Sequence, residues 1–376
     1  MHNRKINILY VVDTLMQRKG ITAVVTNYLR NFNWGELQVD ILAYSDSESE
    51  ILDEYKKLGA NIYFMPKLGL FNFIKFYVYI NNFFKNHKYQ IVHSHLFQLD
   101  FIIFPIARKN GTLTCISHSH NTRFSDHKLK AIRNKLMSLN INNNADIWAA
   151  CSVDAGVALF GKKFEKSKKG IVIKNGINCN IYEFSENLRI RIRKELEISE
   201  NEIVLGHVGR MSLQKNQSFI IDILVELCKY DKRYKVVFVG DGPLYLSLKS
   251  KVHGMQLDKQ VIFLGTRNDV HEIYNVFDFF VYPSIYEGLG IAAIEAQANG
   301  LECFISNHVP KDVDLTSVNF LDINSSAYEW AKEIYNRIPQ RHIEYNNIVK
   351  SRGYDIHTTA LNLQHFYDNC IWESEM

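Results

Sequence analysis

Two glutamates flank a glycine-rich stretch in the second half of the chain. The segment runs Tyr282-Pro-Ser-Ile-Tyr-Glu287-Gly-Leu-Gly-Ile-Ala-Ala-Ile-Glu295, with a strand pattern before it and a helix pattern after it. Glycines let the backbone approach a ligand closely, and the N–H groups that open a helix bind phosphate oxygens. We expect Glu287 in the loop and Glu295 in the helix, both facing one cleft. The alternative is an ordinary capped helix with an exposed glutamate.

A second polar group follows the strand predicted at Ile203–Val208. It contains Gly209 and two cations five residues apart, Arg210 and Lys215. Arginine offers a two-pronged fork and lysine a point charge, a combination that suits a diphosphate. The alternative is a solvated turn before a helix that starts near Asn216.

The glycines of a third motif, Gly240-Asp-Gly242-Pro243-Leu-Tyr245, follow another predicted strand. The motif resembles a dinucleotide-binding fingerprint, but Tyr245 occupies the third glycine position and Pro243 interrupts the pattern. A nicotinamide oxidoreductase is therefore disfavoured, whereas a tight turn beside a nucleotide fits.

Four histidines end two predicted strands of the first half in pairs, His93 with His95 and His118 with His120. Alternate residues of a strand share a face. No carboxylate or cysteine lies nearby in the sequence to complete a ligand set, so we expect no metal. Hydrogen bonding or proton transfer suits these side chains better, with a structural role as the alternative. Gly20, after the first strand, either admits a phosphate or sugar or simply forms a turn.

The elements that must position these residues alternate along the whole chain. Short apolar runs are followed by longer helical patterns, which is typical of parallel strands joined by right-handed crossovers. Ligands of such sheets bind at the carboxyl ends of the strands. The predicted strands are Ile6–Val12, Val39–Ala43, Asn61–Phe64, Ile91–Ser94, Leu113–Ser117, Ile147–Cys151, Ile171–Lys174, Ile203–Val208, Lys235–Val239, Val261–Leu264, Phe279–Tyr282 and Cys303–Ser306.

The alternation pauses at Asn178–Asn187, and 376 residues exceed one ordinary domain. We therefore predict an α/β protein with two doubly wound Rossmann-like domains facing a cleft. The first spans residues 1–180 and the second residues 188–355. Residues 356–376 form a C-terminal helix, centred on His357–Trp372, that we expect to cross back.

Composition excludes several classes of protein. With 47% hydrophobic and 22% charged residues, the chain is neither disordered nor collagen-like. No apolar run approaches the length of a membrane span, and the N-terminal residues do not resemble a signal peptide, so we expect a cytoplasmic protein. The six cysteines are widely spaced, which predicts buried thiols.

Charge is distributed unevenly. Residues 1–185 hold 24 Lys and Arg against 14 Asp and Glu, whereas the remainder holds 20 against 26. Basic stretches at 70–88, 128–135 and 162–169 favour contact with an anionic membrane surface. Nucleic acid is not expected, because no recognised binding module accompanies the charge.

In their order along the chain, these motifs resemble the retaining glycosyltransferases of the GT-B fold, and within them the family-four enzymes of bacterial capsular and exopolysaccharide assembly. The resemblance covers nearly the whole chain. The matching motifs are Gly20, His118-Ser-His120-Asn121, Ala150-Cys-Ser152, Ile173-Lys-Asn175-Gly176-Ile177, Gly209-Arg210 through Lys215-Asn216, Gly240-Asp-Gly242-Pro243, Gly265-Thr-Arg-Asn-Asp269 and Glu287 through Glu295-Ala-Gln.

The resemblance implies a role for each matching residue. Arg210 and Lys215 would hold the donor diphosphate, Glu295 the ribose hydroxyls and Glu287 the transferred sugar. The backbone of four residues would cap the phosphate: Gly288, Leu289, Gly290 and Ile291. Arg267 would border the base, Gly20 would approach the donor, and one of His118 and His120 would contact the sugar.

The implied reaction is metal-independent transfer, with retention, of a sugar from a nucleoside diphosphate sugar (UDP-linked) to a lipid-linked glycan at the inner face of the cell membrane, without a cofactor. The chain departs from the family at Gly290, where proline is common, and at Lys19, where a second glycine is common. The departure at Gly290 bears on sugar specificity more than on activity. The alternatives are a nucleotide-sugar epimerase of the same fold and a nucleotide-sugar-binding protein without turnover.

Overall fold

The computed structural model describes residues 5–16, 20–44, 49–69, 71–125 and 128–375, and the chain forms two compact units. Unit 1 comprises Met1–Ile177 and Ile356–Met376, and unit 2 comprises Asn178–Asp355. The C-terminal segment is thus part of unit 1, and the chain passes from one unit to the other directly after Ile177.

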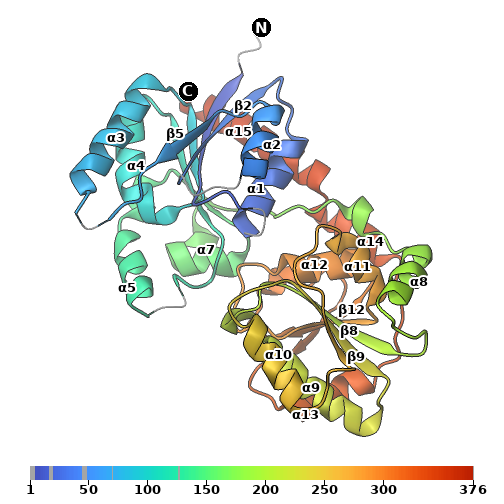
Figure 1. Cartoon of the computed structure of the whole chain (residues 1–376). Helices are drawn as coiled ribbons and strands as arrows, with labels where there is room; N and C mark the ends of the chain where they lie inside the picture. The colour runs from blue at the N-terminus through green and yellow to red at the C-terminus, as the bar shows by residue number, and fades with distance from the viewer. Residues whose placement is uncertain (1–4, 17–19, 45–48, 70, 126–127, 376) are drawn as a thin grey trace. The chain divides into compact units, whose positions relative to one another are not determined.

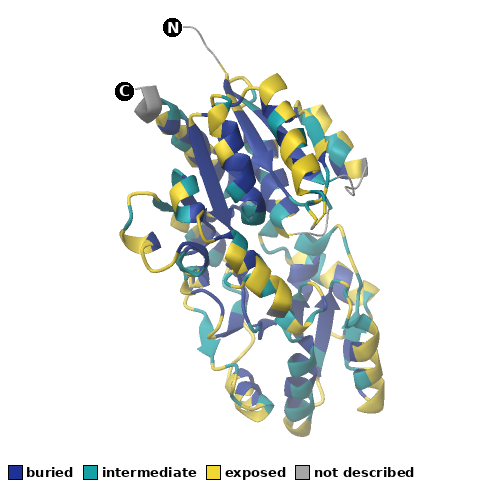
Figure 2. Ribbon diagram, turned by 90° about the vertical axis from the view of Figure 1, so that its left-hand side faces the viewer, coloured by how far each residue is buried: buried dark blue, intermediate teal, exposed yellow. Residues whose placement is uncertain are grey.

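Unit 1 contains a seven-stranded parallel sheet in the order β3-β2-β1-β4-β5-β6-β7. Its strands are β1 Ile6–Val11, β2 Leu37–Tyr44, β3 Ile62–Met65, β4 Ile91–Ser94, β5 Thr114–Ser119, β6 Ile147–Ala150 and β7 Gly170–Val172. Strands buried on both faces need continuous apolar runs, which is why short runs such as Ile147–Ala150 were recognisable in the sequence. Figure 2 shows these strands as buried and the outer faces of the helices as exposed.

Helices cover both faces of this sheet. In Figure 1, α3 and α4 lie on one face, and α1, α2 and α15 lie on the other. The helices of unit 1 are α1 Gly20–Asn31, α2 Ser49–Leu58, α3 Phe73–Asn86, α4 Asp100–Lys109, α5 Lys128–Met137, α6 Ile141–Asn144, α7 Val153–Phe160 and α15 Ile356–Glu375.

The C-terminal helix α15 packs on α1 and contacts β5. The hydroxyl groups of Tyr367 and Tyr10 are 2.6 Å apart. The side-chain oxygen of Gln364 accepts a hydrogen bond from the backbone N–H of Asn33 at 2.9 Å. This helix therefore completes the first unit, although the chain reaches it only after building the second.

Unit 2 repeats the architecture with six parallel strands in the order β10-β9-β8-β11-β12-β13. Its strands are β8 Ile203–Val208, β9 Tyr234–Val239, β10 Val261–Phe263, β11 Phe279–Tyr282, β12 Glu302–Ser306 and β13 Asn319–Leu321. Its helices are α8 Glu186–Glu195, α9 Gln217–Tyr230, α10 Tyr245–Gly254, α11 Val270–Ile273, α12 Ile291–Ala298, α13 Ala327–Tyr335 and α14 Tyr345–Val349.

The two doubly wound sheets agree with the predicted fold class, and every predicted strand is present with small shifts at its ends. The strand β13 at the sheet edge was not predicted. All six cysteines are free, and five are buried; Cys228 is partly exposed. Among the described residues, no helix combines the length and apolar character that crossing a membrane requires.

Candidate active site

In both sheets the strand order reverses, between β1 and β4 in unit 1 and between β8 and β11 in unit 2. Loops that leave adjacent strands in opposite directions open a crevice at such a reversal. In unit 2 the loop after β8 carries Arg210 and Lys215, and the loop after β11 carries Glu287. The fold therefore brings together two motifs that are far apart in the sequence.

Lys215 is the centre of this group in unit 2. Its Nζ donates hydrogen bonds to Oε1 of Glu287 at 2.7 Å and to the hydroxyl of Tyr282 at 2.5 Å. The side chains of Lys215 and Glu287 are only 16% and 8% exposed. Water has little access to this ion pair and cannot replace either partner at low cost. The positions of the two side chains are therefore well defined.

The electrostatics of the pair keep Lys215 charged. Burial alone would lower the pKa of Lys215, but the charge of Glu287 and the hydrogen bonds to Glu287 and Tyr282 outweigh burial and raise it above its ordinary value. Burial also raises the pKa of Tyr282, so its hydroxyl remains protonated. The site therefore holds a permanent cation next to a carboxylate.

Arg210 lies on the surface of the same loop. It is exposed, and its guanidinium has no hydrogen bond or ion pair with the residues that the structure describes. Its backbone carbonyl accepts a hydrogen bond from Nε2 of Gln217 at 2.9 Å, which fixes the loop to the start of α9. An arginine on an anchored loop with an unoccupied fork is suited to bind an anion.

The glycines of the third motif support this loop. A Cβ at Gly240 would lie 2.2 Å from the carbonyl oxygen of Gly209, and one at Gly242 would lie 2.3 Å from that of Met211. Any side chain at either position would displace the loop that carries Arg210. The motif that fails as a dinucleotide fingerprint thus has a packing role.

Glu295 lies in α12, as expected, and each of its two carboxylate oxygens accepts a hydrogen bond from a tyrosine. Its Oε1 accepts a hydrogen bond from the hydroxyl of Tyr182 at 2.8 Å, and its Oε2 accepts one from Tyr274 at 2.7 Å. Burial raises the pKa of Glu295, although both hydrogen bonds act in the opposite direction. Each carboxylate oxygen retains a second lone pair for a ligand hydroxyl.

The backbone from Gly288 to Ile291 forms the loop and first residue of α12. Gly290 is the N-cap with φ +98° and ψ 52°, and the helix begins without a side-chain cap. This left-handed conformation suits glycine, whereas proline is restricted to φ near −65°. The residue common in the family at this position is therefore incompatible with the backbone observed here.

Arg267 pairs with Asp269, and no hydrogen bond or ion pair between described residues joins it to the Lys215 group. Its Nε donates to Oδ1 of Asp269 at 2.8 Å, and its Nη2 pairs with Oδ2 of the same carboxylate. The Arg267 charge is thus balanced by a neighbour two residues away.

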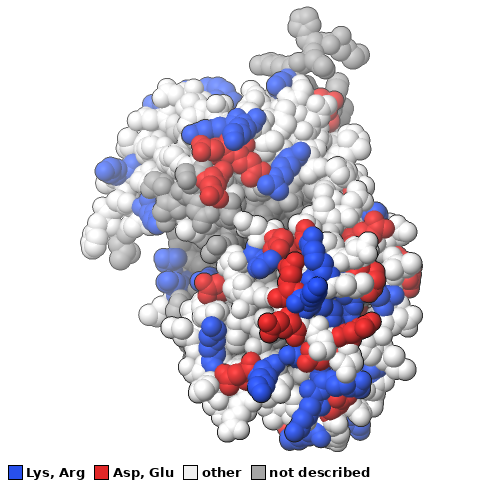
Figure 3. All heavy atoms as spheres, turned by 45° about the vertical axis from the view of Figure 1, so that its right-hand side comes forward, with Lys and Arg blue, Asp and Glu red and all other residues white. Residues whose placement is uncertain are grey.

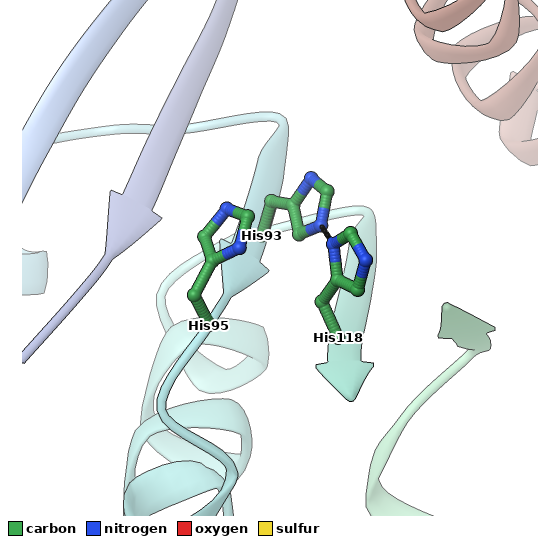
Figure 4. Close-up of side chains that lie close together, drawn as sticks. All are labelled: His93, His95 and His118. Carbon is green, nitrogen blue, oxygen red and sulfur yellow. Dashed lines mark hydrogen bonds between the residues drawn. The ribbon is translucent and has the colours of Figure 1, made fainter. Parts of the chain in front are cut away.

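In unit 1, His118 and His120 join His93 and His95 in one cluster at the ends of β4 and β5. Figure 4 shows three of the four, His93, His95 and His118. Nε2 of His93 is 3.0 Å from Nδ1 of His118, and Nδ1 of His95 is 2.7 Å from Nε2 of His120. Burial lowers the pKa of His93 to about 3 and that of His120 to about 4, and lowers those of the other two strongly. At neutral pH all four imidazoles are uncharged.

Three of these histidines, His93, His95 and His118, each offer one nitrogen within 4.8 Å of the others. The sequence offers no carboxylate or cysteine nearby as a further ligand, but a third histidine comes close because β4 and β5 are adjacent. In the observed arrangement, however, both nitrogens of His93 are occupied, one by His118 and the other by the hydroxyl of Tyr367 at 2.7 Å. A metal ion would have to replace the His93–His118 hydrogen bond.

A cavity of about 220 Å³ opens beside the cluster. Its polar lining includes His95, His118, His120 and Asn121, and its apolar lining includes Phe97 and Phe124. Nε2 of His95, Nε2 of His118 and Oε1 of Gln98 are buried and have no hydrogen-bond partner among the residues that the structure describes. Gly20 is the exposed first residue of α1, and a Cβ there would meet nothing within 4 Å. Lys19 lies outside the described residues.

Sequence reasoning missed four tyrosines that position the predicted residues: Tyr182, Tyr274, Tyr282 and Tyr367. Tyr282 could have been recognised, because it ends the strand that leads into Glu287. The other three lie in segments without a motif, and their roles depend on contacts with distant parts of the chain.

Comparison with known proteins places the chain in a family. Residues 189–313 match the model of the family described as glycosyl transferases group 1. EpsF of Bacillus subtilis, named as a glycosyltransferase, is 31% identical over 340 residues, which are 89% of this chain and 88% of EpsF. The UDP-Gal:alpha-D-GlcNAc-diphosphoundecaprenol alpha-1,3-galactosyltransferase of Escherichia coli is 29% identical over 69% of this chain and 70% of its own.

The capsular polysaccharide biosynthesis glycosyltransferase CapH of Staphylococcus aureus is 26% identical over 88% of this chain and 90% of its own. The solved structure of Anabaena Alr3699/HepE in complex with UDP and glucose superposes with a TM-score of 0.79 at 16% identity, covering 96% of this chain and 99% of the other. With this fold and these relatives, the chain belongs to the group 1 glycosyltransferases of the GT-B type.

Proposed function

We propose that this glycosyltransferase moves a sugar, with retention and without a metal ion, from a UDP-sugar to a lipid-diphosphate-linked glycan during surface polysaccharide synthesis. The observation that carries the proposal is the group of Lys215, Glu287 and Arg210 at the strand-order reversal of unit 2. The names of the relatives, which include a UDP-galactose-dependent transferase acting on a diphosphoundecaprenol-linked sugar and a capsule enzyme, support the class of donor and acceptor.

Departure of a nucleoside diphosphate leaves negative charge on a phosphate oxygen. The ammonium of Lys215 has three N–H donors and uses two on Glu287 and Tyr282, so one is left for that oxygen. The free guanidinium of Arg210 supplies a second cation. A preplaced donor of this kind stabilises a transition state by roughly 3 kcal/mol, which is why a metal ion is not required.

Retention follows if the acceptor hydroxyl attacks from the face that the diphosphate leaves, with the leaving phosphate accepting the proton. Glu287 is held by Lys215 and then acts on the sugar as a fixed hydrogen-bond acceptor. We assign no covalent nucleophile. Glu295 receives the ribose hydroxyls through the lone pairs that Tyr182 and Tyr274 leave free.

The first experiment incubates the purified chain with a panel of nucleoside diphosphate sugars in the presence of EDTA and measures nucleotide release. We expect nucleotide release from one UDP-sugar, and we expect this release to be lost in Arg210→Ala and in Glu287→Ala. Arg233→Ala is the control and should keep it, because Arg233 forms a surface ion pair with Asp231. If no donor is hydrolysed, calorimetry of donor binding separates a missing acceptor from a misassigned site. Strict dependence on an added metal ion would contradict the metal-free mechanism.

A lipid-linked acceptor implies work at a membrane surface, and α5 suits this role. Its Leu129, Ile132 and Leu136 are 83%, 59% and 61% exposed and share one face by their spacing. Lys130 and Arg133 are exposed on the same helix. An exposed apolar face beside basic residues is typical of a helix that lies in the headgroup region of anionic lipids.

The basic stretch at 162–169 differs from α5. Between Lys162 and Lys169 the lysines are exposed but Phe164 is buried, so this segment contributes charge alone. On the face of the molecule drawn in Figure 3, basic and acidic side chains are interspersed over unit 2. Mixed charge attracts an anionic surface only weakly.

Sedimentation with phosphatidylcholine vesicles, with and without phosphatidylglycerol, tests this surface. We expect binding to anionic vesicles that is weakened most by the triple change Leu129→Ser, Ile132→Ser and Leu136→Ser. Charge reversal of Lys162, Lys163 and Lys166 should weaken it by about 1 kcal/mol per lysine that lies near the lipid. Donor hydrolysis should persist in both variants. Undiminished vesicle binding by both would exclude these surfaces.

A further inference from the structure

A chain of four side chains runs from the C-terminal helix to the cavity of unit 1. The hydroxyls of Tyr10 (β1) and Tyr367 (α15) are 2.6 Å apart, and the hydroxyl of Tyr367 is 2.7 Å from Nδ1 of His93 (β4). Nε2 of His93 is 3.0 Å from Nδ1 of His118 (β5), which Figure 4 marks with a dashed line. Nε2 of His118 is buried and has no partner within the described part of the chain, and the His118 side chain lines the cavity.

Every member of the chain is electrically neutral at pH 7. Burial raises the pKa of both tyrosines and lowers that of both histidines. A neutral imidazole has one N–H, and a hydroxyl has one hydrogen. The direction of any one hydrogen bond in the chain therefore determines the direction of all the others.

The buried hydroxyl of Tyr10 indicates which of the two directions the hydrogen bonds take. Its side chain is 1% exposed, and among the described residues its hydroxyl has no hydrogen-bond partner except Tyr367. If Tyr10 only accepted, its hydrogen would be buried without an acceptor, at a cost of about 1–3 kcal/mol. Tyr10 therefore donates to Tyr367, Tyr367 donates to Nδ1 of His93, and Nε2–H of His93 donates to Nδ1 of His118.

We infer that Tyr367 acts as a positioning residue that holds His118, one of the residues lining the cavity of unit 1, in its Nε2–H form, so that a ligand contacting this nitrogen must supply an acceptor oxygen. The inference rests on the proposed function in one respect, that the ligand oxygen belongs to the sugar substrate. In this form Nε2 of both His93 and His118 carries hydrogen, so neither nitrogen is available to a metal ion.

The hydrogen positions can be measured without any assay of activity. The full chain is labelled with [15N]histidine, its long-range 1H–15N spectrum is recorded at neutral pH, and His118 is assigned by its loss in His118→Gln. We expect the Nε2–H pattern for His118 in the natural chain. In Tyr367→Phe, where nothing imposes a direction, we expect a mixture with the Nδ1–H form. In Tyr10→Phe the hydroxyl of Tyr367 still has to donate to His93, so the Nε2–H form should persist.

The Nδ1–H form in the natural chain, or an unchanged His118 pattern in Tyr367→Phe, would overturn the inference. Addition of Zn²⁺ is a second arm: stoichiometric loss of the Nε2–H signal of His118 would show that the cluster is a metal site instead. The expected result is an unchanged spectrum.

The link to the reaction is tested separately by comparing Tyr367→Phe with Tyr28→Phe. Tyr28 is another buried tyrosine of unit 1, whose hydroxyl bonds the carbonyl of Lys174 and takes no part in the chain. We expect kcat/KM for the donor to fall by about 10-fold in Tyr367→Phe, the size of one lost hydrogen bond, and to change little in Tyr28→Phe. A shifted tautomer with unchanged kcat/KM would refute the contact between His118 and substrate while leaving the hydrogen-bond chain established.

Discussion

Nζ of Lys215 lies 2.7 Å from Oε1 of Glu287, although the two residues are 72 positions apart and come from different loops. The contact exists because β8 and β11 are neighbours in the sheet. It joins the cation expected to bind the donor diphosphate to the carboxylate expected to meet the sugar. Each residue therefore orients the other, and Glu287 helps to keep Lys215 charged.

The first prediction concerns this pair. Glu287→Gln and Lys215→Met should each lower kcat by about 10²–10³-fold, because each removes a preplaced charge at the reacting centre. The kcat of the double variant should fall by much less than the product of the two single reductions, since the effects of substituting residues in direct contact are not additive. Urea unfolding should show that Lys215→Met is less stable than the double variant, because it leaves Glu287 buried without its partner. Fully additive losses in rate would show that the residues act independently.

The second prediction concerns Glu295. Glu295→Gln should weaken donor binding by about 10- to 100-fold, the value of a hydrogen bond to a charged group, and leave kcat nearly unchanged. Tyr274→Phe should have a smaller effect in the same direction, because Tyr182 still holds one carboxylate oxygen. Calorimetric titration with the UDP-sugar measures both. A large fall in kcat without a change in Kd would mean that Glu295 contacts the reacting sugar.

The third prediction concerns Gly290. Gly290→Ala should lower stability by roughly 1–2 kcal/mol, because φ is +98° and the new Cβ would lie 3.2 Å from Cγ1 of Val309. Gly290→Pro should cost roughly 3 kcal/mol or more, because proline cannot adopt this φ. Gly254→Ala is the matched control, since a Cβ at Gly254 meets nothing within 4 Å. Thermal unfolding compares the three. Natural stability in Gly290→Pro would show that the loop readily takes a conformation that accommodates proline.

The fourth prediction concerns pH. Five histidines have a pKa lowered by burial, among them His93 to about 3, and His120 and His207 to about 4; the other two are His95 and His118. Below pH 6.5 the unfolded chain binds protons that the folded chain rejects, so stability should fall as the pH falls. Each histidine contributes up to about 1.4 kcal/mol per pH unit.

Asp100 acts in the opposite direction. Burial raises its pKa to about 7. Ionising Asp100 in the folded state therefore lowers the free energy of unfolding increasingly as the pH rises from about 4 to 7, and the full reduction is present above pH 7. One carboxylate cannot offset five histidines, and the free energy of unfolding should drop from about pH 7 to about pH 5. Asp100→Asn should be more stable than the natural chain at about pH 8 and should lose that advantage in acid. Stability that is flat across this range would show that the histidines are not buried in the neutral form.

Much of the fold was predictable from periodicity. β8 and β11 begin and end at the predicted residues, because both are short and mainly apolar, as strands buried on both faces are. The edge strand β13, Asn319–Leu321, escaped prediction because three residues carry no recognisable pattern, and pairing with β12 is what makes them a strand. The loop positions of Arg210, Lys215 and Glu287 were likewise predictable, since each follows such a run.

By itself, the sequence determined the order of the elements, the existence of two α/β units and the loops that carry the candidate residues. Those properties depend on neighbours along one strand or helix, and the spacing of apolar residues records them directly. Only the tertiary structure decided that Tyr182 and Tyr274 hold Glu295, that Gly240 packs against Gly209, and that Tyr367 reaches His93 from 274 positions away. A hydrogen bond requires two side chains to meet within narrow limits of distance and angle, and for residues on different elements that meeting is set by how the sheets and helices pack.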